Sequence, residues 1–220
     1  ANVAPLEKFT TIYSGMDIAD FINANSHRAS VRQELGFSED NIVVGKIARL
    51  FDLKGHEYLV SAASEIVKSN PAVHFLLIGD GILREQIETQ IERAGLSEHF
   101  HFTGLVPPSQ IPRYLGAMDI LAHTSLREGL ARALPQALLA GRPVVSFDID
   151  GAKEVCISDE TGYLIEPRNI TALETAILKL AESKSLREKL GSHGQQMCET
   201  MYPHQDMTNQ IRALYQQLLA

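Results

Sequence analysis

Short apolar runs alternate along most of this chain with segments that carry apolar residues at helical spacing. Runs of strand length recur six times from residue 41 onward, at 41–48, 74–78, 100–104, 119–123, 143–147 and 162–165. The intervening segments place apolar residues three and four apart, which is typical of amphipathic helices. These helices are expected at 56–68, 82–94, 109–118 and 132–140.

The two ends of the chain follow other patterns. Beyond the last strand, apolar spacing predicts three consecutive helices at about 170–182, 185–199 and 205–219. The opening 40 residues are less regular, with a short strand expected at 11–13 and a short helix at 30–35. The last of these helices carries an apolar stripe, formed by Ile211, Leu214, Tyr215 and Leu218.

Regular alternation of strands and helices predicts the fold class. It implies βαβ crossovers, and therefore an α/β, Rossmann-like domain with a parallel sheet of about six strands and helices on both faces. In such sheets, ligands bind beyond the carboxyl ends of the strands. The residues that follow each strand are therefore the first candidates for a functional site.

Composition narrows the range of functions. The chain has 220 residues, 45% of them hydrophobic and 21% charged, which suits a globular protein with one large α/β domain or two small ones. A net charge of -7, without any dense block of Lys or Arg, argues against a nucleic-acid surface or a polybasic membrane patch. Two distant cysteines, Cys156 and Cys198, predict neither a disulfide framework nor a structural zinc site.

Location and completeness can be predicted only from simple signals. No apolar run approaches the roughly 20 residues that span a bilayer, and the first residues lack the pattern of a signal peptide. We therefore expect a cytoplasmic protein. Because the chain begins at Ala1 without an initiator Met, we also expect it to be part of a longer protein.

Two cations follow the first predicted strand. Arg49 and Lys54 lie on the loop that leads into the next helix. A guanidinium fork and a compact ammonium suit phosphate oxygens, and a helix N-terminus adds unpaired N–H groups. The pair could clamp a diphosphate, although two solvated charges on a surface loop are the alternative.

A carboxylate followed by glycine marks the end of the fourth strand. Glu128 and Gly129 stand at a strand-to-helix turn, where the carboxylate could accept hydrogen bonds from hydroxyl groups. Gln136 lies two turns into the following helix and could face the same cleft. Otherwise, Glu128 is an acid favoured by the helix dipole and Gln136 is a surface residue.

Six motifs in a fixed order give this chain a family resemblance. They are Arg49 to Gly55, Leu77 to Gly81, Phe102 to Pro107, Ser125 to Gly129, Ala140 to Val145, and Gly151 to Glu154 with Thr161 to Leu164. This series resembles the C-terminal domain of retaining glycosyltransferases of the GT-B architecture, family 4 in particular. Each motif is weak alone, and the resemblance extends over roughly residues 11–220.

The resemblance implies a role for each candidate residue. Arg49 and Lys54 would hold the donor diphosphate and stabilise the leaving nucleotide, and Glu128 would contact the transferred sugar. The other donor-binding positions implied are Gly79, Gly81, Val106, Gly129, Leu130, Ala131, Arg132, Ala133 and Gln136. The ligand would be a nucleoside-diphosphate sugar of the UDP or GDP type, with no cofactor and no metal. Asp148 and Asp150 are accordingly interpreted as turn residues, and His123 as a packed histidine.

Three departures from the family pattern stand out. Gln136 replaces the second Glu of an E-x7-E motif that grips the ribose, so weaker ribose binding is expected. Ala48 replaces a small residue that is often Gly. The third departure is the N-terminal, acceptor-binding domain, which residues 1–220 do not contain; residues 1–10 would then be the end of the interdomain linker. The resemblance also implies that the last helix packs toward that domain, so some of its apolar stripe is expected to be exposed.

The resemblance implies a functional expectation with two alternatives. We expect the C-terminal half of a retaining glycosyltransferase that transfers a sugar to a hydroxyl acceptor and needs its partner domain to act. No nucleic acid and no membrane insertion are expected, although the other domain could attach peripherally to a membrane. The alternatives are a noncatalytic nucleotide-sugar-binding module, favoured by Gln136, or a GT-B relative such as a sugar-nucleotide epimerase or a phosphorylase.

Overall fold

The computed structural model describes residues 5–129 and 131–219, leaving aside the side chain of Leu6. It contains the predicted sheet, in which every strand pairs in parallel with its neighbours. The strands are β1 (Ile42–Ile47), β2 (Val73–Ile78), β3 (Phe100–Gly104), β4 (Ile120–His123), β5 (Val144–Phe147) and β6 (Gly162–Ile165). Their order across the sheet is β3-β2-β1-β4-β5-β6, so the direction of winding reverses between β1 and β4.

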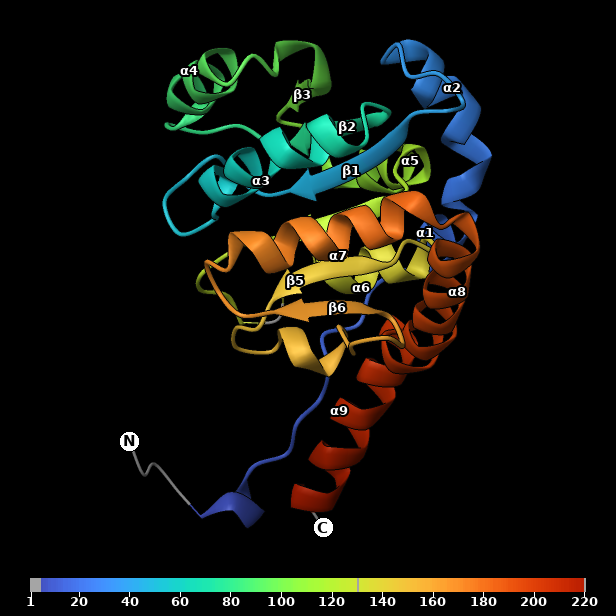
Figure 1. The fold of residues 1–220 in the computed structure, drawn as a ribbon. Helices are drawn as coiled ribbons and strands as arrows, with labels where there is room; N and C mark the ends of the chain where they lie inside the picture. The colour runs from blue at the N-terminus through green and yellow to red at the C-terminus, as the bar shows by residue number, and fades with distance from the viewer. Residues whose placement is uncertain (1–4, 130, 220) are drawn as a thin grey trace.

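The helices cover both faces of this sheet (Figure 1). They are α1 (Ala19–Ile22), α2 (Arg28–Glu34), α3 (His56–Ser69), α4 (Arg84–Arg93), α5 (Ile111–Ala117), α6 (Ala133–Leu139), α7 (Ile170–Glu182), α8 (Lys184–Met201) and α9 (His204–Leu219). The prediction of an α/β domain with helices on both faces is thereby confirmed.

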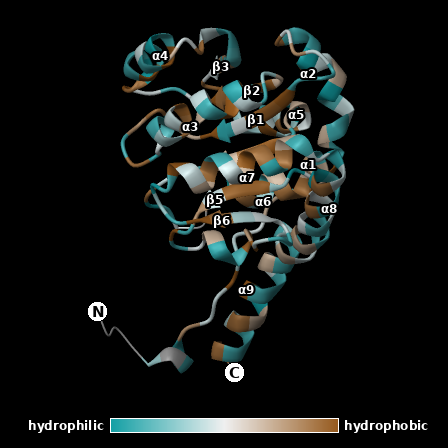
Figure 2. Ribbon diagram, in the orientation of Figure 1, coloured by the Kyte–Doolittle hydropathy of each residue, from teal (hydrophilic) through white to brown (hydrophobic). Residues whose placement is uncertain are grey.

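Two apolar clusters form the core, one on each face of the sheet. Helices α3, α4 and α7 contribute to the first cluster, through residues such as Leu59 and Ile177. The second cluster joins α1, α2, α5 and α6 to the end of α8, with Met118 and Leu138 at its centre. Burial of each large apolar side chain contributes about 1.5–3 kcal/mol, so these two layers dominate stability. Figure 2 shows the apolar colour concentrated on the strands and on the helix faces that pack against them.

The N-terminal segment differs from its prediction. Residues 11–13 form no strand, and the chain is held instead by a bridge between Met16 and Pro203. The Met16 N–H donates to Tyr202 O at 2.9 Å, and the His204 N–H donates to Met16 O at 3.1 Å. A short apolar run becomes a strand only where a sheet edge receives it, and here the run meets the turn between α8 and α9.

The last helix packs loosely on the rest of the domain. None of the α9 side chains that the structure describes is buried, and Tyr215 and Leu218 are 63% and 72% exposed. The predicted exposure of its apolar stripe is therefore confirmed, and Figure 2 shows the stripe alternating with polar turns. Among the described helices, none is long and apolar enough to cross a membrane.

Candidate functional site

The site begins where β1 and β4 run side by side at the centre of the sheet. The loops that follow these strands are joined by two hydrogen bonds. The Leu126 N–H donates to Leu53 O at 2.8 Å, and the Thr124 hydroxyl donates to Gly55 O at 2.6 Å. Two segments some 70 residues apart in sequence, which carry Lys54 and Glu128, are thereby brought into one rigid unit.

Gly55 makes this close approach possible. Its φ of +66° lies in the left-handed region, and it precedes α3 as the N-cap residue. A Cβ atom at this position would lie 1.9 Å from Thr124 O. Only glycine fits here, because a side chain would both strain the backbone and force the two loops apart.

Lys54 and Glu128 form an ion pair at the centre of the site. Lys54 Nζ lies 2.5 Å from Glu128 Oε1, and both side chains are about three-quarters buried. The Ser125 hydroxyl donates to the same carboxylate oxygen at 3.1 Å. The Glu128 N–H donates to Asp150 Oδ2 at 2.7 Å, so the loop after β5 also holds this residue.

His123 stands behind the ion pair. It is buried at the end of β4, with Nε2 at 3.8 Å from Glu128 Oε1 and Nδ1 at 3.2 Å from the Ser146 hydroxyl. A neutral imidazole protonated on Nε2 would point that N–H at the carboxylate, while the Ser146 hydroxyl donates to Phe147 O at 3.0 Å. The imidazole of His123 and the ammonium of Lys54 lower the pKa of Glu128 to about 2. Glu128 is therefore an anion at neutral pH.

A buried lysine supports the two loops from below. Lys46, in β1, is 1% exposed and donates to the Thr124 hydroxyl at 2.8 Å. Burial lowers the pKa of its ammonium to about 7. The chain of contacts from Lys46 through Thr124 to Gly55 connects strand β1 with the loop that carries Lys54.

Arg49 sits at the mouth of the site. Its side chain is exposed, and in the described part of the chain it makes no ion pair. Its backbone is fixed, because Nε2 of the buried His56 lies 3.0 Å from Arg49 O. The guanidinium is thus anchored at its root while its donors face solvent, as an anion-binding side chain requires.

The predicted glycines after β2 help to pack the strand ends together. The Gly79 N–H donates to Gly104 O at 3.0 Å, and a Cβ on Gly79 would lie 2.1 Å from Ala48 O. Gly81 approaches Leu50 O in the same way. Val106, after β3, is half-buried against the second apolar cluster. Contact of these three residues with a donor stays a prediction.

The start of α6 completes the inventory. Gly129 is exposed with open space around its Cα, and Arg132 is the exposed N-cap residue, without a side-chain cap. Ala131 and Gln136 are half-buried, and Ala133 is buried. Leu130, also predicted to bind the donor, lies outside the described residues.

Sequence reasoning missed three contributors. His123 had no visible carboxylate partner, yet it faces Glu128. Asp150, interpreted as a turn residue, has a φ of +43° and also holds the Glu128 backbone. Lys46 was not predicted as a contributor, although a lysine inside an apolar strand run is an unusual feature that could have indicated it. Within the described residues, no three His, Cys, Asp or Glu side chains are arranged to hold a metal ion.

Residues 27–197 match the family described as Glycosyl transferases group 1. The chain belongs to this family. Its sheet and helices superpose on HepE of Anabaena in complex with UDP-glucose, with a TM-score of 0.88 and 29% identity, over 98% of this chain and 59% of HepE. It is also 29% identical over 144 residues to the 2-deoxystreptamine glucosyltransferase of Streptomyces kanamyceticus, covering 66% of this chain and 37% of that enzyme.

A third comparison concerns the extent of this group 1 domain. The structural match with the C-terminal domain of LpcC from Francisella tularensis covers 86% of this chain and 99% of that domain, with a TM-score of 0.75. At 23% identity, this similarity shows the fold alone. The part of the chain that matches the curated relatives covers between 30% and 59% of their length. The chain therefore has the fold of one half of a GT-B glycosyltransferase.

Proposed function

We propose that the chain is the donor-binding, C-terminal half of a retaining glycosyltransferase. The complete protein would transfer a sugar from a nucleoside-diphosphate donor to a hydroxyl acceptor, and a preceding domain would bind that acceptor. The observation that carries this proposal is the Lys54–Glu128 ion pair at the reversal between β1 and β4, with Arg49 on the same loop as Lys54. In open α/β sheets this is the position at which ligands bind.

The chemistry of the site suits the departure of a nucleoside diphosphate. Negative charge develops on the distal phosphate as the bond to the sugar breaks. The fixed cations Arg49 and Lys54 would stabilise that charge, as a metal does in other transferases. Glu128, anionic at neutral pH, would accept hydrogen bonds from sugar hydroxyls. Gln136 would meet the ribose with one acceptor oxygen.

The Lys54–Glu128 ion pair has a consequence for binding. The Lys54 ammonium is engaged by the Glu128 carboxylate at 2.5 Å. A phosphate would compete for the same ammonium, so donor binding would turn the pair into a shared arrangement of carboxylate, ammonium and phosphate. Because uridine nucleotides occupy the related HepE, we propose UDP-sugars as the first donors to test.

The isolated chain is proposed to bind nucleotide with little or no turnover, because half of the catalytic cleft would come from the other domain. A noncatalytic nucleotide-sugar-binding module is the competing proposal. The observation that favours it is Gln136, which lacks the charge and second acceptor of a glutamate.

Calorimetric titration of the chain with UDP, GDP and ADP tests the donor site. Binding of one nucleotide is expected, and both Arg49→Ala and Lys54→Ala should weaken it at least about tenfold, because each removes a charge-assisted contact with phosphate. Lys68→Ala, at an exposed position of α3, is the control and should bind like the parent chain. Equal affinity in all variants would refute the site.

Activity separates the two proposals. Full-length protein should transfer sugar from the nucleotide-sugar whose nucleotide binds, and Gln136→Glu should raise its affinity for that donor. Donor binding without transfer to any hydroxyl acceptor would favour the noncatalytic module.

A further inference from the structure

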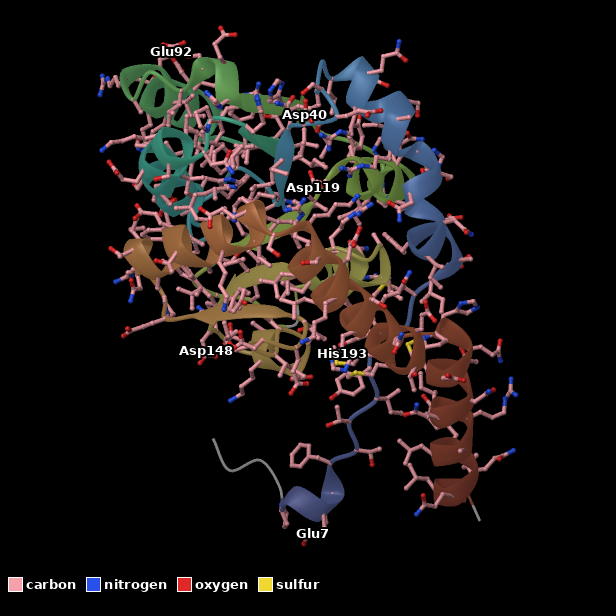
Figure 3. The ribbon with its side chains drawn as sticks, turned by 45° about the vertical axis from the view of Figure 1, so that its right-hand side comes forward. Glu7, Asp40, Glu92, Asp119, Asp148 and His193 are labelled. Atoms are coloured by element: carbon pink, nitrogen blue, oxygen red, sulfur yellow. The ribbon has the colours of Figure 1, made fainter. Side chains whose placement is uncertain are left out.

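A second concave surface lies at the opposite end of the sheet, where the strands begin. Its volume is about 970 Å³, and α2, α8 and the starts of β1 and β4 line it. In Figure 3, Asp119, just before β4, marks the end of the sheet where strands begin, and Asp148, just after β5, marks the end where they finish. We call this surface the arginine groove. Its volume falls in the range of small-molecule sites.

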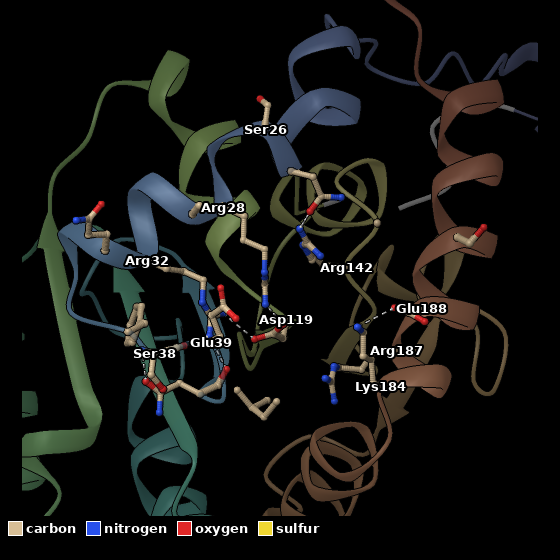
Figure 4. A pocket seen from close by; sticks show the side chains of 18 of the residues that line it. Ser26, Arg28, Arg32, Ser38, Glu39, Asp119, Arg142, Lys184, Arg187 and Glu188 are labelled. Atoms are coloured by element: carbon tan, nitrogen blue, oxygen red, sulfur yellow. Dashed lines mark hydrogen bonds and ion pairs between the residues drawn. The ribbon is translucent and has the colours of Figure 1, made fainter.

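The arginine groove concentrates positive charge. Its lining holds five cations and three carboxylates: Arg28, Arg32, Arg142, Lys184 and Arg187 against Glu39, Asp119 and Glu188. This excess of two positive charges occurs in a chain whose net charge is -7. Figure 4 shows Arg28 and Arg32 of α2 at Asp119, with Arg142 and Arg187 further along the groove.

Asp119 is fully engaged by its neighbours. It pairs with Arg28 at 2.7 Å and with Arg32 at 3.2 Å, and it accepts the Val43 N–H at 2.8 Å. Arg32 also donates to Ala117 O, Ser38 O and Asn41 O. These contacts tie α2 to the sheet, so Asp119 and Arg32 serve the fold and Asp119 has little capacity left to neutralise other cations.

Arg142 and Arg187 are held by carbonyl groups. Arg142 Nε donates to Leu115 O at 3.2 Å and Nη2 donates to Gly116 O at 3.1 Å. Arg187 Nη1 donates to Leu180 O and Ala181 O at 2.7 and 2.9 Å. A carbonyl satisfies an N–H group without neutralising a charge. Over residues 5–129 and 131–219, neither guanidinium has a carboxylate within 4.0 Å.

Keeping these two charges together is unfavourable without a counterion. Burial, followed by the field of Arg28, lowers the pKa of Arg142 to about 10, and burial also lowers the pKa of Arg187. Partly buried arginines are normally paired with an anion. Arg142 Nη1 and Arg187 Nε and Nη2 have no acceptor among the described residues, so donors remain for a ligand.

We propose that the arginine groove binds a phosphate-bearing ligand through Arg142 and Arg187, with Lys184 at its rim. The planar guanidinium matches phosphate oxygens, and a phosphate dianion would offset the two excess charges. The groove is larger than one phosphate group and includes Phe37 and Ile42, so the phosphate would enter with part of its carrier. This site is separate from the candidate donor site at the other end of the strands.

Inorganic pyrophosphate is the probe for this proposal. Because the donor site could also bind it, the parent for the test is the chain with Arg49→Ala and Lys54→Ala. Calorimetry should detect pyrophosphate binding to that parent, and adding Lys184→Gln and Arg187→Gln should weaken it at least about tenfold, because two cations leave the groove. No binding to the parent would overturn the proposal.

The matched control removes two exposed lysines outside the groove. Lys68→Gln with Lys189→Gln changes the net charge by the same amount, and Lys189 lies on the same helix as Arg187. This control should bind pyrophosphate like the parent, and an equal loss in both pairs would refute a specific site. The melting temperature of each variant, measured without ligand, identifies any that fail to fold, and Arg187→Lys then serves as the milder replacement.

Vesicles distinguish the two sources of phosphate. Phosphatidylglycerol vesicles that bind the parent, release it on addition of pyrophosphate and lose it in the Lys184→Gln/Arg187→Gln variant would assign the ligand to a lipid headgroup. Pyrophosphate binding without vesicle binding would assign a phosphorylated small molecule. Vesicle binding that is equal in the groove variant and the control would count against the groove.

Discussion

At the scale of single residues, Glu128 has the most demanding environment in the candidate donor site. It accepts hydrogen bonds from Lys54 and Ser125, faces His123, and is fixed through its backbone by Asp150. So many favourable partners keep the carboxylate ionised. They also mean that a donor phosphate would compete with Glu128 for the Lys54 ammonium.

The substitution Glu128→Gln is expected to separate nucleotide binding from transfer. It removes the competitor for the Lys54 ammonium, so UDP should bind several-fold more tightly to the chain, by about 1 kcal/mol on the scale of a partly buried ion pair. Transfer by the full-length protein should fall, because the carboxylate at the sugar is lost. Titration of the variant against Glu85→Gln, an exposed substitution on α4, checks this expectation. Weaker UDP binding than in Glu85→Gln would show that Glu128 assists the phosphate contact.

At the scale of elements, the loops after β1 and β4 behave as one unit because Gly55 allows their backbones to touch. The sequence predicts this pairing only in part. Arg49, Lys54 and Glu128 could be found because parallel strands end at one edge of the sheet, and strand ends are readable from apolar runs. The partners of Lys46 and Asp150 could not be predicted, because these contacts depend on the register between β1 and β4 and on the path of the loop after β5.

The arginine groove could not be predicted from the sequence either. Its cations come from α2, α8 and the turn after α6. That these three segments lie side by side can be predicted only from the strand order. A single segment shows at most two of these cations one turn apart, as Arg28 and Arg32 are on α2. In both sites, the sequence therefore does not predict the contacts between different elements, because no periodic pattern within one element encodes them.

Gly55→Ala tests the contact between the loops. The new Cβ would lie 1.9 Å from Thr124 O, and the alanine backbone would have to adopt a φ of +66°. A loss of about 2–5 kcal/mol in the free energy of unfolding is therefore expected. Gly36→Ala is the matched control, because its φ is +75° and a Cβ there would have open space around it. The control should lose only the backbone contribution of about 1–2 kcal/mol. Urea denaturation of both variants decides the matter, and equal losses would show that the loops do not clash.

At the scale of the whole molecule, buried imidazoles link stability to pH. Burial and the nearby Lys46 lower the pKa of His56 to about 3. Burial and the neighbouring His99 and His101 lower the pKa of His74 to about 4. His74 stacks on His99 and lies 3.3 Å from His101, at the edge of the sheet formed by β2 and β3. Both His56 and His74 are therefore neutral in the folded chain across the physiological range.

The expected result is a chain that loses stability in mild acid. Below pH 6.5 the unfolded chain takes up protons that the folded chain refuses, so stability is full above that pH and declines as the pH falls toward 4. Each histidine contributes a slope of up to about 1.4 kcal/mol per pH unit. His74→Gln should flatten the dependence measured by urea denaturation from pH 7 to 4, whereas His193→Gln, at an exposed position, should leave it unchanged. An unaltered slope in His74→Gln would contradict this account.

The bridge between Met16 and Pro203 also determines how the domain can be moved. The segment that leads into the sheet and the helix that leads out of it meet at one corner and depart on the same side (Figure 1). A force applied to both ends of the domain is therefore transmitted through this corner and not through the sheet. Such a force would leave the geometry of the strand ends unchanged.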